Sequence, residues 1–266
     1  MVKTGTVSIA ETRAIWDEKA GFWDERMAEG NAFHLSAVAP AAEALLGDVD
    51  GRRILDIGCG NGVFSRRLAA LGATVVATDF SQAFLQRAEA RTAGRAEADR
   101  IAWRQVDATD PGALAAIGGQ PFDLVVSTMA LQDMPAIEPL ASASPSLLRP
   151  GGAFVAVVPH PCFNTVDAVR FSETREVNGT SLTERGVRTS RYLTPIAALG
   201  VGIPGEPRPH HYFERTVSGY LDPWLTAGMV LDGLTELPFR PSGQPDGDPD
   251  TDLPVTLAFR FRNTAT

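Results

Sequence analysis

The chain has 266 residues, 44% of them hydrophobic and 21% charged, which is typical of a globular protein with a substantial core. Its formal net charge of -8 argues against a nucleic-acid partner, because binding phosphate needs clustered Lys and Arg. The two cysteines, Cys59 and Cys162, form no metal-ligand pattern, and no apolar run is long enough to span a membrane. We therefore expect a cytoplasmic protein with no metal site and no membrane partner.

Two helices are predicted before the first strand, and we interpret residues 1–49 as an N-terminal helical cap. In residues 10–30, apolar side chains recur at three- and four-residue steps, which is typical of an amphipathic helix. Residues 34–48 predict a second helix that Gly47 ends. Pro40 either kinks this helix or begins a new one.

From Arg52, apolar strands and helical segments alternate along the chain. The predicted strands are 52–58, 73–79, 101–107, 122–129 and 153–160, and the predicted helices between them are 63–72, 81–93, 110–118 and 136–152. Nearly continuous apolar strands are typical of a sheet buried on both faces. The alternation therefore predicts an α/β fold with a doubly wound, mostly parallel sheet.

This alternation stops at residue 161. Residues 161–215 are rich in polar residues, Gly and Pro, and we interpret them as an insertion with short strands. It is either a lid over an acceptor pocket or a homodimer contact. The cofactor-binding core would then comprise residues 50–160 and 216–266.

The last part of the core begins with a helix and a strand, predicted in residues 216–237. An acidic, turn-forming loop is predicted in 241–254, and a final strand in 255–263. The alternation of apolar and polar residues in that final strand suggests an antiparallel strand on the edge side of the sheet.

Three glycines, Gly58, Gly60 and Gly62, crowd the end of the first predicted strand. Glycine lets the backbone approach a ligand, and the following helix offers free N–H groups and a positive dipole end. The nicotinamide-binding fingerprint is G-x-G-x-x-G, and Val63 occupies its third glycine position here. Asp79 ends the second strand, where a carboxylate can accept hydrogen bonds from both hydroxyls of a ribose.

The segments "ILDIGCGNG" and "VVATD" resemble those of the class I S-adenosylmethionine-dependent methyltransferases. The resemblance continues in "WRQVDATD", "FDLVVSTMALQDM" and "LLRPGGAFVAVV", and it covers residues 50–160 well. It implies a seven-stranded sheet whose last strand is antiparallel and lies between the fifth and sixth. It also implies that S-adenosylmethionine binds across the carboxyl ends of the strands.

The resemblance also assigns cofactor-binding roles to individual positions. Around the methionine part it places Asp56, Gly58, Cys59, Gly60 and Gly62. Asp56 lies within an apolar run, so it needs partners, either loop amides or the cationic end of the ligand.

The resemblance assigns the adenosine part of the cofactor to residues at the ends of the second and third predicted strands. In the resemblance Asp79 holds the ribose and Phe80 flanks the adenine. Asp107 accepts from the exocyclic amine, while the Ala108 amide donates to a ring nitrogen. After the fourth strand, Ser127 and Met129 border the region of the methyl group.

Methyl transfer requires that the protein hold the acceptor near the methyl group and exclude water, and it needs a base only if the acceptor arrives protonated. Four residues are candidates for that role. Asp133 follows the fourth strand where the family often shows histidines, His160 closes the fifth strand, and His210 and His211 lie in the insertion. Each histidine could equally be an ordinary polar residue.

Aromatic side chains accompany these candidates. Trp16, Phe22 and Trp23 lie on or near one face of the first helix, as core packing or as a cation–π cover for the sulfonium. The aromatic residues of the insertion would suit an apolar or aromatic acceptor.

The sequence thus predicts an S-adenosylmethionine-dependent methyltransferase acting on oxygen, nitrogen or carbon of a small molecule, such as a specialised metabolite. One alternative is a methyltransferase-like protein that binds the cofactor without transferring its methyl group. Another is a nicotinamide-dependent oxidoreductase, against which Val63 counts.

Overall fold

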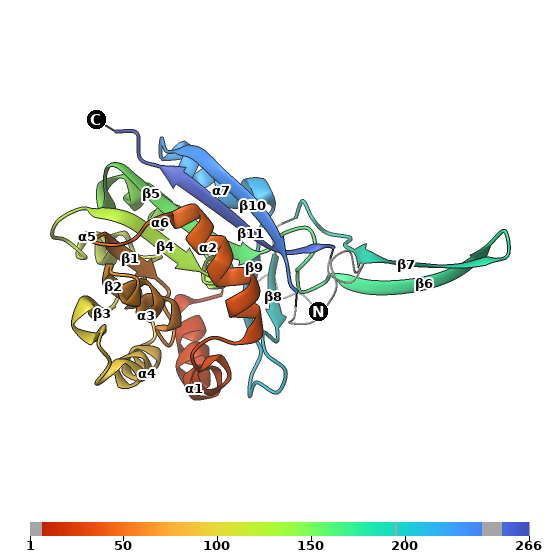
Figure 1. Ribbon diagram of the computed structural model, residues 1–266, viewed down its shortest axis with the longest axis horizontal. Helices are drawn as coiled ribbons and strands as arrows, with labels where there is room; N and C mark the ends of the chain where they lie inside the picture. Colours follow the sequence, from red (N-terminus) through yellow and green to blue (C-terminus); the bar gives the residue numbers. More distant parts are fainter. Residues whose placement is uncertain (1–6, 195, 241–251, 266) are drawn as a thin grey trace.

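The computed structural model describes residues 7–194, 196–240 and 252–265, so most of the predicted acidic loop at 241–254 lies outside the described residues. The centre of the protein is a seven-stranded sheet in the order β10-β11-β5-β4-β1-β2-β3 (Figure 1). Its strands, in chain order, are β1 (Arg53–Ile57), β2 (Thr74–Asp79), β3 (Ile101–Gln105), β4 (Phe122–Thr128), β5 (Leu148–Pro159), β10 (Val230–Pro238) and β11 (Pro254–Arg262). This is the α/β doubly wound sheet expected from the sequence.

Strand direction follows the resemblance, with one correction to the interpretation of the last strand. β1 to β5 pair in parallel, whereas β11 is antiparallel to both β5 and β10. β11 is therefore interior, and the expectation of an edge-side strand is wrong. Its polar residues misled the prediction because Arg260 and Arg262 turn toward the edge strand, where both pair with Asp232.

Helices cover both faces of the sheet. One face packs against α2 (Ala39–Leu46), α3 (Val63–Ala70) and α4 (Gln82–Thr92), and the other against α5 (Pro111–Ala115), α6 (Glu138–Leu147) and α7 (Val217–Thr226). Both faces of the central strands are buried, which explains why their sequences are almost continuously apolar. Among the described helices, none combines the length and apolar character needed to cross a membrane.

The N-terminal region forms α1 (Ile9–Met27), a π-helical turn η1 (His34–Val38) and α2. Ser8 caps α1 by accepting a hydrogen bond from the Glu11 amide. Pro40 stands in the first turn of α2, so it begins a helix, and Gly47 ends that helix as expected. α1 lies against α4.

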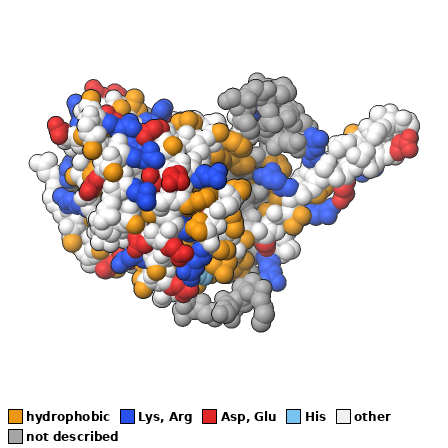
Figure 2. Space-filling model, turned by 90° about the horizontal axis from the view of Figure 1, so that it is seen from below, with side chains coloured by type: hydrophobic (Ala, Val, Ile, Leu, Met, Phe, Trp, Pro, Cys, Tyr) orange, Lys and Arg blue, Asp and Glu red, His pale blue; other side chains and the backbone are white. Residues whose placement is uncertain are grey.

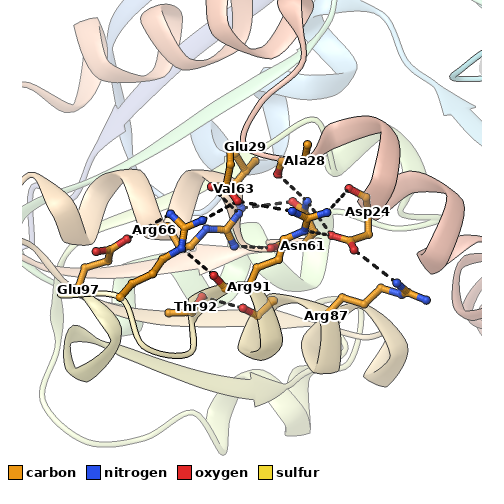
Figure 3. A network of polar contacts seen from close by, with 12 residues as sticks. Asp24, Ala28, Glu29, Asn61, Val63, Arg66, Arg87, Arg91, Thr92 and Glu97 are labelled. Atoms are coloured by element: carbon orange, nitrogen blue, oxygen red, sulfur yellow. Dashed lines mark hydrogen bonds and ion pairs between the residues drawn. The ribbon is translucent and has the colours of Figure 1, made fainter.

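A polar network joins α1 to the glycine-rich loop (Figure 3). Asn61 of that loop donates to Asp24 Oδ1 at 3.2 Å and to the Ala28 carbonyl at 3.1 Å. Arg91 of α4 also binds Asp24, and the buried Arg66 donates to the Asn61 carbonyl at 2.7 Å. Because buried polar groups are costly when unpaired, these bonds hold the loop and both helices in one arrangement.

The insertion 161–215 forms two separate hairpins. β6 (Val169–Val177) and β7 (Thr180–Arg188) pair with each other and project from the body as an exposed arm (Figure 1). Figure 2 shows hydrophobic side chains gathered where this arm leaves the body. β8 (Ile196–Gly200) and β9 (His210–Glu214) instead pack beside α1 and a short 3-10 turn, η3 (Leu131–Asp133).

We expect Gly62→Ala to lower the free energy of unfolding by about 2–4 kcal/mol, from backbone strain and overpacking together. Gly62 has φ +76°, and an added Cβ would lie 2.4 Å from the Trp103 ring. Gly94→Ala is the matched control, since Gly94 has φ +77° in a tight turn but no atom within 4 Å of the added Cβ. Urea unfolding should give the control a loss of only about 1–2 kcal/mol. Equal losses would show that the contact with Trp103 is unimportant.

Candidate active site

A cavity of about 650 Å³ opens at the carboxyl ends of β1 to β4, between the glycine loop, α1 and the β8–β9 hairpin. This volume lies within the range of small-molecule sites. Most residues predicted for the cofactor line it, namely Gly58, Cys59, Gly60, Asp79, Phe80, Asp107, Ala108 and Met129. Gly58 and Gly60 both have positive φ, so backbone rather than side chains forms this part of the wall.

The glycine loop and η3 are in direct contact because Gly58 has no side chain. A Cβ at Gly58 would lie 2.4 Å from the Cβ of Ala130, the residue that precedes η3. Met129, beside it, also has positive φ at 53°. The two residues that follow Leu131 in η3, Gln132 and Asp133, are thereby held next to the glycine loop and line the cavity.

Asp79 closes the carboxyl end of β2 inside this cavity. One carboxylate oxygen accepts from the Gly60 amide at 2.9 Å and the other from the Ser81 amide at 2.8 Å. Burial raises the pKa of Asp79 to about 6. Each oxygen has two lone pairs, so the carboxylate retains capacity for ligand hydroxyls.

Asp107 and Phe80 form a neighbouring part of the wall. Asp107 accepts hydrogen bonds from Arg13 of α1 at 3.1 Å and from the Thr109 amide at 2.9 Å. The Arg13 guanidinium also lies 5.9 Å from the centre of the Phe80 ring. An α1 side chain thus reaches the region that the resemblance gives to adenine.

Three of the predicted cofactor residues lie behind the cavity wall. Asp56 is 1% exposed and accepts from the Ser65 hydroxyl at 2.5 Å, and burial raises its pKa to about 7. Ser127 is fully buried in β4. Gly62 is the N-cap residue of α3 and packs against Trp103. None of the three is among the residues that line the cavity.

Asp133 faces the cavity with an unsatisfied oxygen. Its Oδ1 is buried and has no hydrogen-bond partner among the described residues, and burial raises its pKa well above the usual value. Arg215 fixes the turn that carries it, donating to the Leu131 carbonyl at 3.1 Å and the Met134 carbonyl at 2.7 Å. Gln132 Oε1 is also buried without a described partner.

Of the three candidate histidines, the structure brings only His210 to the cavity. His210 Nε2 lies 3.6 Å from Asp133 Oδ1. His211 follows it in β9 and points to the other side, because side chains alternate along a strand. His160 is engaged elsewhere, with Nε2 2.6 Å from Glu236 and Nδ1 accepting from the Cys162 amide. His160 and His211 are therefore not placed for the catalytic roles expected of them.

The aromatic face of α1 encloses a cation of the protein itself. The Lys19 ammonium lies 4.4 Å from the centre of the Trp16 ring and 5.6 Å from that of Trp23. Both tryptophans also line the cavity, whereas Phe22 contacts Arg26. The cation that these rings contact in the structure is therefore Lys19 of the protein.

Sequence reasoning missed several residues at this site, namely Lys19, His34, Gln132 and Arg215. His34 lines the cavity, and burial lowers its pKa to about 4. The one available signal was Lys19, which shares a helical face with Trp16 and Trp23 at three- and four-residue steps. Such a lysine usually reaches solvent, so the pattern does not reveal a buried charge.

The comparisons with known proteins agree with this geometry. Residues 55–154 match the profile of a family described as a methyltransferase domain. The chain is 34% identical to a ubiquinone biosynthesis O-methyltransferase of Alkalilimnicola ehrlichii, over 75% of this chain and 69% of that protein. A ubiquinone biosynthesis O-methyltransferase of Rhizobium etli is 31% identical over 58% of this chain, which spans 62% of that relative's length. The crystal structure of an S-adenosylmethionine-dependent methyltransferase from Mesorhizobium loti matches 88% of this chain and 99% of its own, with a TM-score of 0.66 and 26% identity.

The doubly wound sheet, the glycine loop and the acid at the end of β2 define a nucleotide-binding α/β protein. Together with the similarity over three quarters of the sequence, they show that the chain belongs to the S-adenosylmethionine-dependent methyltransferases. S-adenosylmethionine is the cofactor of this family.

The residues present fit that cofactor. At Gly58 and Gly60 the loop presents its backbone to the cavity without side chains, and Asp79 lines the cavity next to them. Buried polar atoms without a described partner also belong to residues that line the cavity, among them Trp16 Nε1 and Gln132 Oε1. Among the described residues, no group of three or more His, Cys, Asp or Glu is arranged to hold a metal ion.

The raised pKa of Asp56 gives a stability prediction. The folded state binds this proton more tightly than the unfolded chain, so the contribution of Asp56 to stability falls as pH rises from about 4 through 7. Asparagine keeps an acceptor for Ser65 and cannot ionise. We expect the free energy of unfolding of Asp56→Asn, measured by urea unfolding, to rise by about 2–3 kcal/mol relative to that of the wild type between pH 5 and pH 8. If the variant and the wild type differ in stability by the same amount at both pH values, the raised pKa of Asp56 is contradicted.

Proposed function

We propose that this chain transfers a methyl group from S-adenosylmethionine to a hydroxyl oxygen of an aromatic small molecule. When bound, S-adenosylmethionine supplies an electrophilic methyl group on a sulfonium centre. The observation that carries the proposal is the buried, unpartnered Oδ1 of Asp133, held next to the glycine loop by the contact of Gly58 with Ala130. This carboxylate would serve as a proton acceptor beside the wall that would hold the cofactor.

The residues that would hold the cofactor form one continuous part of the wall. Asp79 would accept from the ribose hydroxyls. Phe80 and Asp107 would border the adenine, and the backbone at Gly58 and Gly60 would lie against the methionine part. Asp56, Ser127 and Gly62 would maintain the shape of the loop without touching the ligand.

The remaining wall suits an aromatic hydroxyl compound. Trp16, Trp23 and Tyr212 line it with aromatic surface, and Trp16 Nε1 is a buried donor without a described partner. Asp133 would accept the proton of the hydroxyl, and its raised pKa makes it a stronger base than an ordinary carboxylate. The names of the Alkalilimnicola and Rhizobium relatives, both O-methyltransferases, support oxygen as the acceptor atom.

The direct test is incubation with S-adenosylmethionine and a panel of phenols and catechols, with the matching anilines as controls. We expect methylated products from hydroxyl compounds only. Cofactor binding with no product from any acceptor would instead support the alternative of a cofactor-binding protein that transfers no methyl group.

Asp79→Ala should weaken cofactor binding by about 1.5–3 kcal/mol, because a two-oxygen acceptor for the ribose is lost. Calorimetric titration with S-adenosylmethionine, S-adenosylhomocysteine and NADH in parallel gives the measurement. The wild type should bind the first two and not NADH. An unchanged dissociation constant in the variant would refute the ribose assignment, and binding of NADH alone would support the oxidoreductase alternative.

Asp133→Asn should lower kcat by about 10²–10⁴-fold, because a general base is removed, while cofactor affinity stays the same. The deficit should shrink at pH values above the pKa of the acceptor, where the hydroxyl is already ionised. Asp110→Asn is a matched control, since Asp110 is an exposed helix cap whose function asparagine preserves. A deficit that does not depend on pH would contradict the role of Asp133 as a base.

The N-terminal helices and the insertion would enclose the cavity from two sides. The N-terminal helices of residues 1–49 would cover the cofactor, and the β8–β9 part of the insertion 161–215 would cover the acceptor. A cytoplasmic location and a homodimer remain predictions. The projecting β6–β7 arm is the part of the insertion available for a contact between two copies.

A further inference from the structure

Lys19 carries a buried charge that the proposed reaction does not use directly. Its side chain is 0% exposed, and its ammonium lies 3.0 Å from Glu206 Oε2 and 2.5 Å from His210 Nδ1. Glu206, in the turn between β8 and β9, is likewise 0% exposed at its side chain. A lysine of α1 is thus enclosed by the hairpin that forms the far wall of the cavity.

The surroundings of Lys19 favour the charged ammonium. Glu206 also accepts from the Trp23 indole N–H at 3.0 Å and the Gly202 amide at 3.3 Å. A carboxylate that receives donors in this way is stabilised as an anion, and an anion this deeply buried requires a cation. The Trp16 ring, 4.4 Å away, adds cation–π stabilisation. Burial lowers the pKa of Lys19, and Glu206 opposes that shift.

An ammonium has three donors and no acceptor, so the atom it contacts must present a lone pair. His210 Nδ1 therefore carries no proton, and the proton of the neutral ring lies on Nε2. We propose that Lys19 is a positioning residue that fixes His210 as the Nε2–H tautomer, so that His210 donates toward the cavity while Asp133 alone accepts the proton. Two neighbouring groups 3.6 Å apart thereby receive opposite roles.

The charges around His210 maintain this state. The titratable groups that face it are Lys19 of α1, Glu206 of the β8–β9 turn, Asp133 of η3 and Tyr212 of β9, whose ring centre lies 4.4 Å from that of His210. The adjacent His211 points away from it but also affects its charge. Burial, followed by the charge of Lys19, lowers the pKa of His210 to about 3. The ring is therefore neutral throughout the physiological range, and it can hold a hydroxyl oxygen by donation from Nε2.

The consequence for turnover rests on the proposed function, whereas the tautomer itself does not. A hydroxyl oxygen has two lone pairs, so it can accept from His210 with one and attack the methyl group with the other after its proton passes to Asp133. The neutral nitrogen of an amine has only one lone pair, which donation from His210 would occupy. The pair of groups therefore favours oxygen over nitrogen.

The first measurement uses the wild-type protein alone. The chain has only four histidines and two lysines, Lys3 and Lys19, so nitrogen-15 labelling of each residue type gives few signals. His210→Gln assigns the ring signal. We expect a protonated Nε2, an unprotonated Nδ1 and a charged Lys19 ammonium, all unchanged from pH 5.5 to 8.5. A proton on Nδ1, or a ring that titrates in this range, would overturn the inference.

The second measurement removes the cation. Lys19→Met leaves Glu206 unpaired and could prevent folding, so the double variant Lys19→Met/Glu206→Gln is made beside it. In either variant we expect His210 to titrate nearer neutral pH, because the positive charge that lowers its pKa is gone. Arg208→Met is the matched control. It removes an exposed ion pair with Glu18 that joins the same two segments, and it should leave the His210 signal unchanged.

Kinetics separate a positioning role from a structural one. With a hydroxyl acceptor, the double variant should lose about 10–100-fold in kcat, with a new acid limb at the pKa of its His210, while cofactor affinity is kept. If His210 keeps its tautomer and does not titrate in the double variant, Lys19 is not its cause and the inference fails. If the wild type shows the tautomer but methylates nothing, the proposed function fails and the tautomer assignment stands.

Discussion

The buried ammonium of Lys19 sets the arrangement of the cavity wall. An isolated charge in a protein interior costs several kcal/mol, so it requires an anion and well-directed acceptors. Glu206 and His210 provide them from the β8–β9 hairpin, and His210 is 191 residues from Lys19 in the chain. The cation therefore joins α1 to the hairpin, and the aromatic residues of both segments come to line one cavity.

The same cation explains what the aromatic stripe of α1 does. The sequence left two roles open for Trp16 and Trp23, core packing or a cation–π cover for the sulfonium, and the cation beside both rings in the structure is a lysine of the protein. Their faces enclose Lys19, while parts of both rings remain on the cavity wall. The electron-rich faces are thus already engaged by a charge of the protein, and the buried Trp16 N–H has no partner among the described residues.

The sequence predicted the sheet, the helices between its strands and the glycine loop, because these depend on local patterns of apolar residues and glycines. It predicted less about the acceptor region, where contacts join distant segments. His210 and His211 could not be distinguished without knowing which face of β9 meets the cavity. Similarly, Glu236 lies 76 residues from His160, so nothing local shows that His160 is already paired.

The electrostatics of the site divide its acid–base roles between two neighbours. Burial raises the pKa of Asp133, whereas burial and Lys19 lower that of His210. Groups whose pKa values are pushed apart in this way take different roles in proton transfer. In the proposed reaction the imidazole, which is the usual base at neutral pH, would act as a donor, and the carboxylate would be the base. Arg215 fixes the backbone of η3 through its carbonyl oxygens rather than pairing with Asp133, so it orients that carboxylate without a direct ion pair.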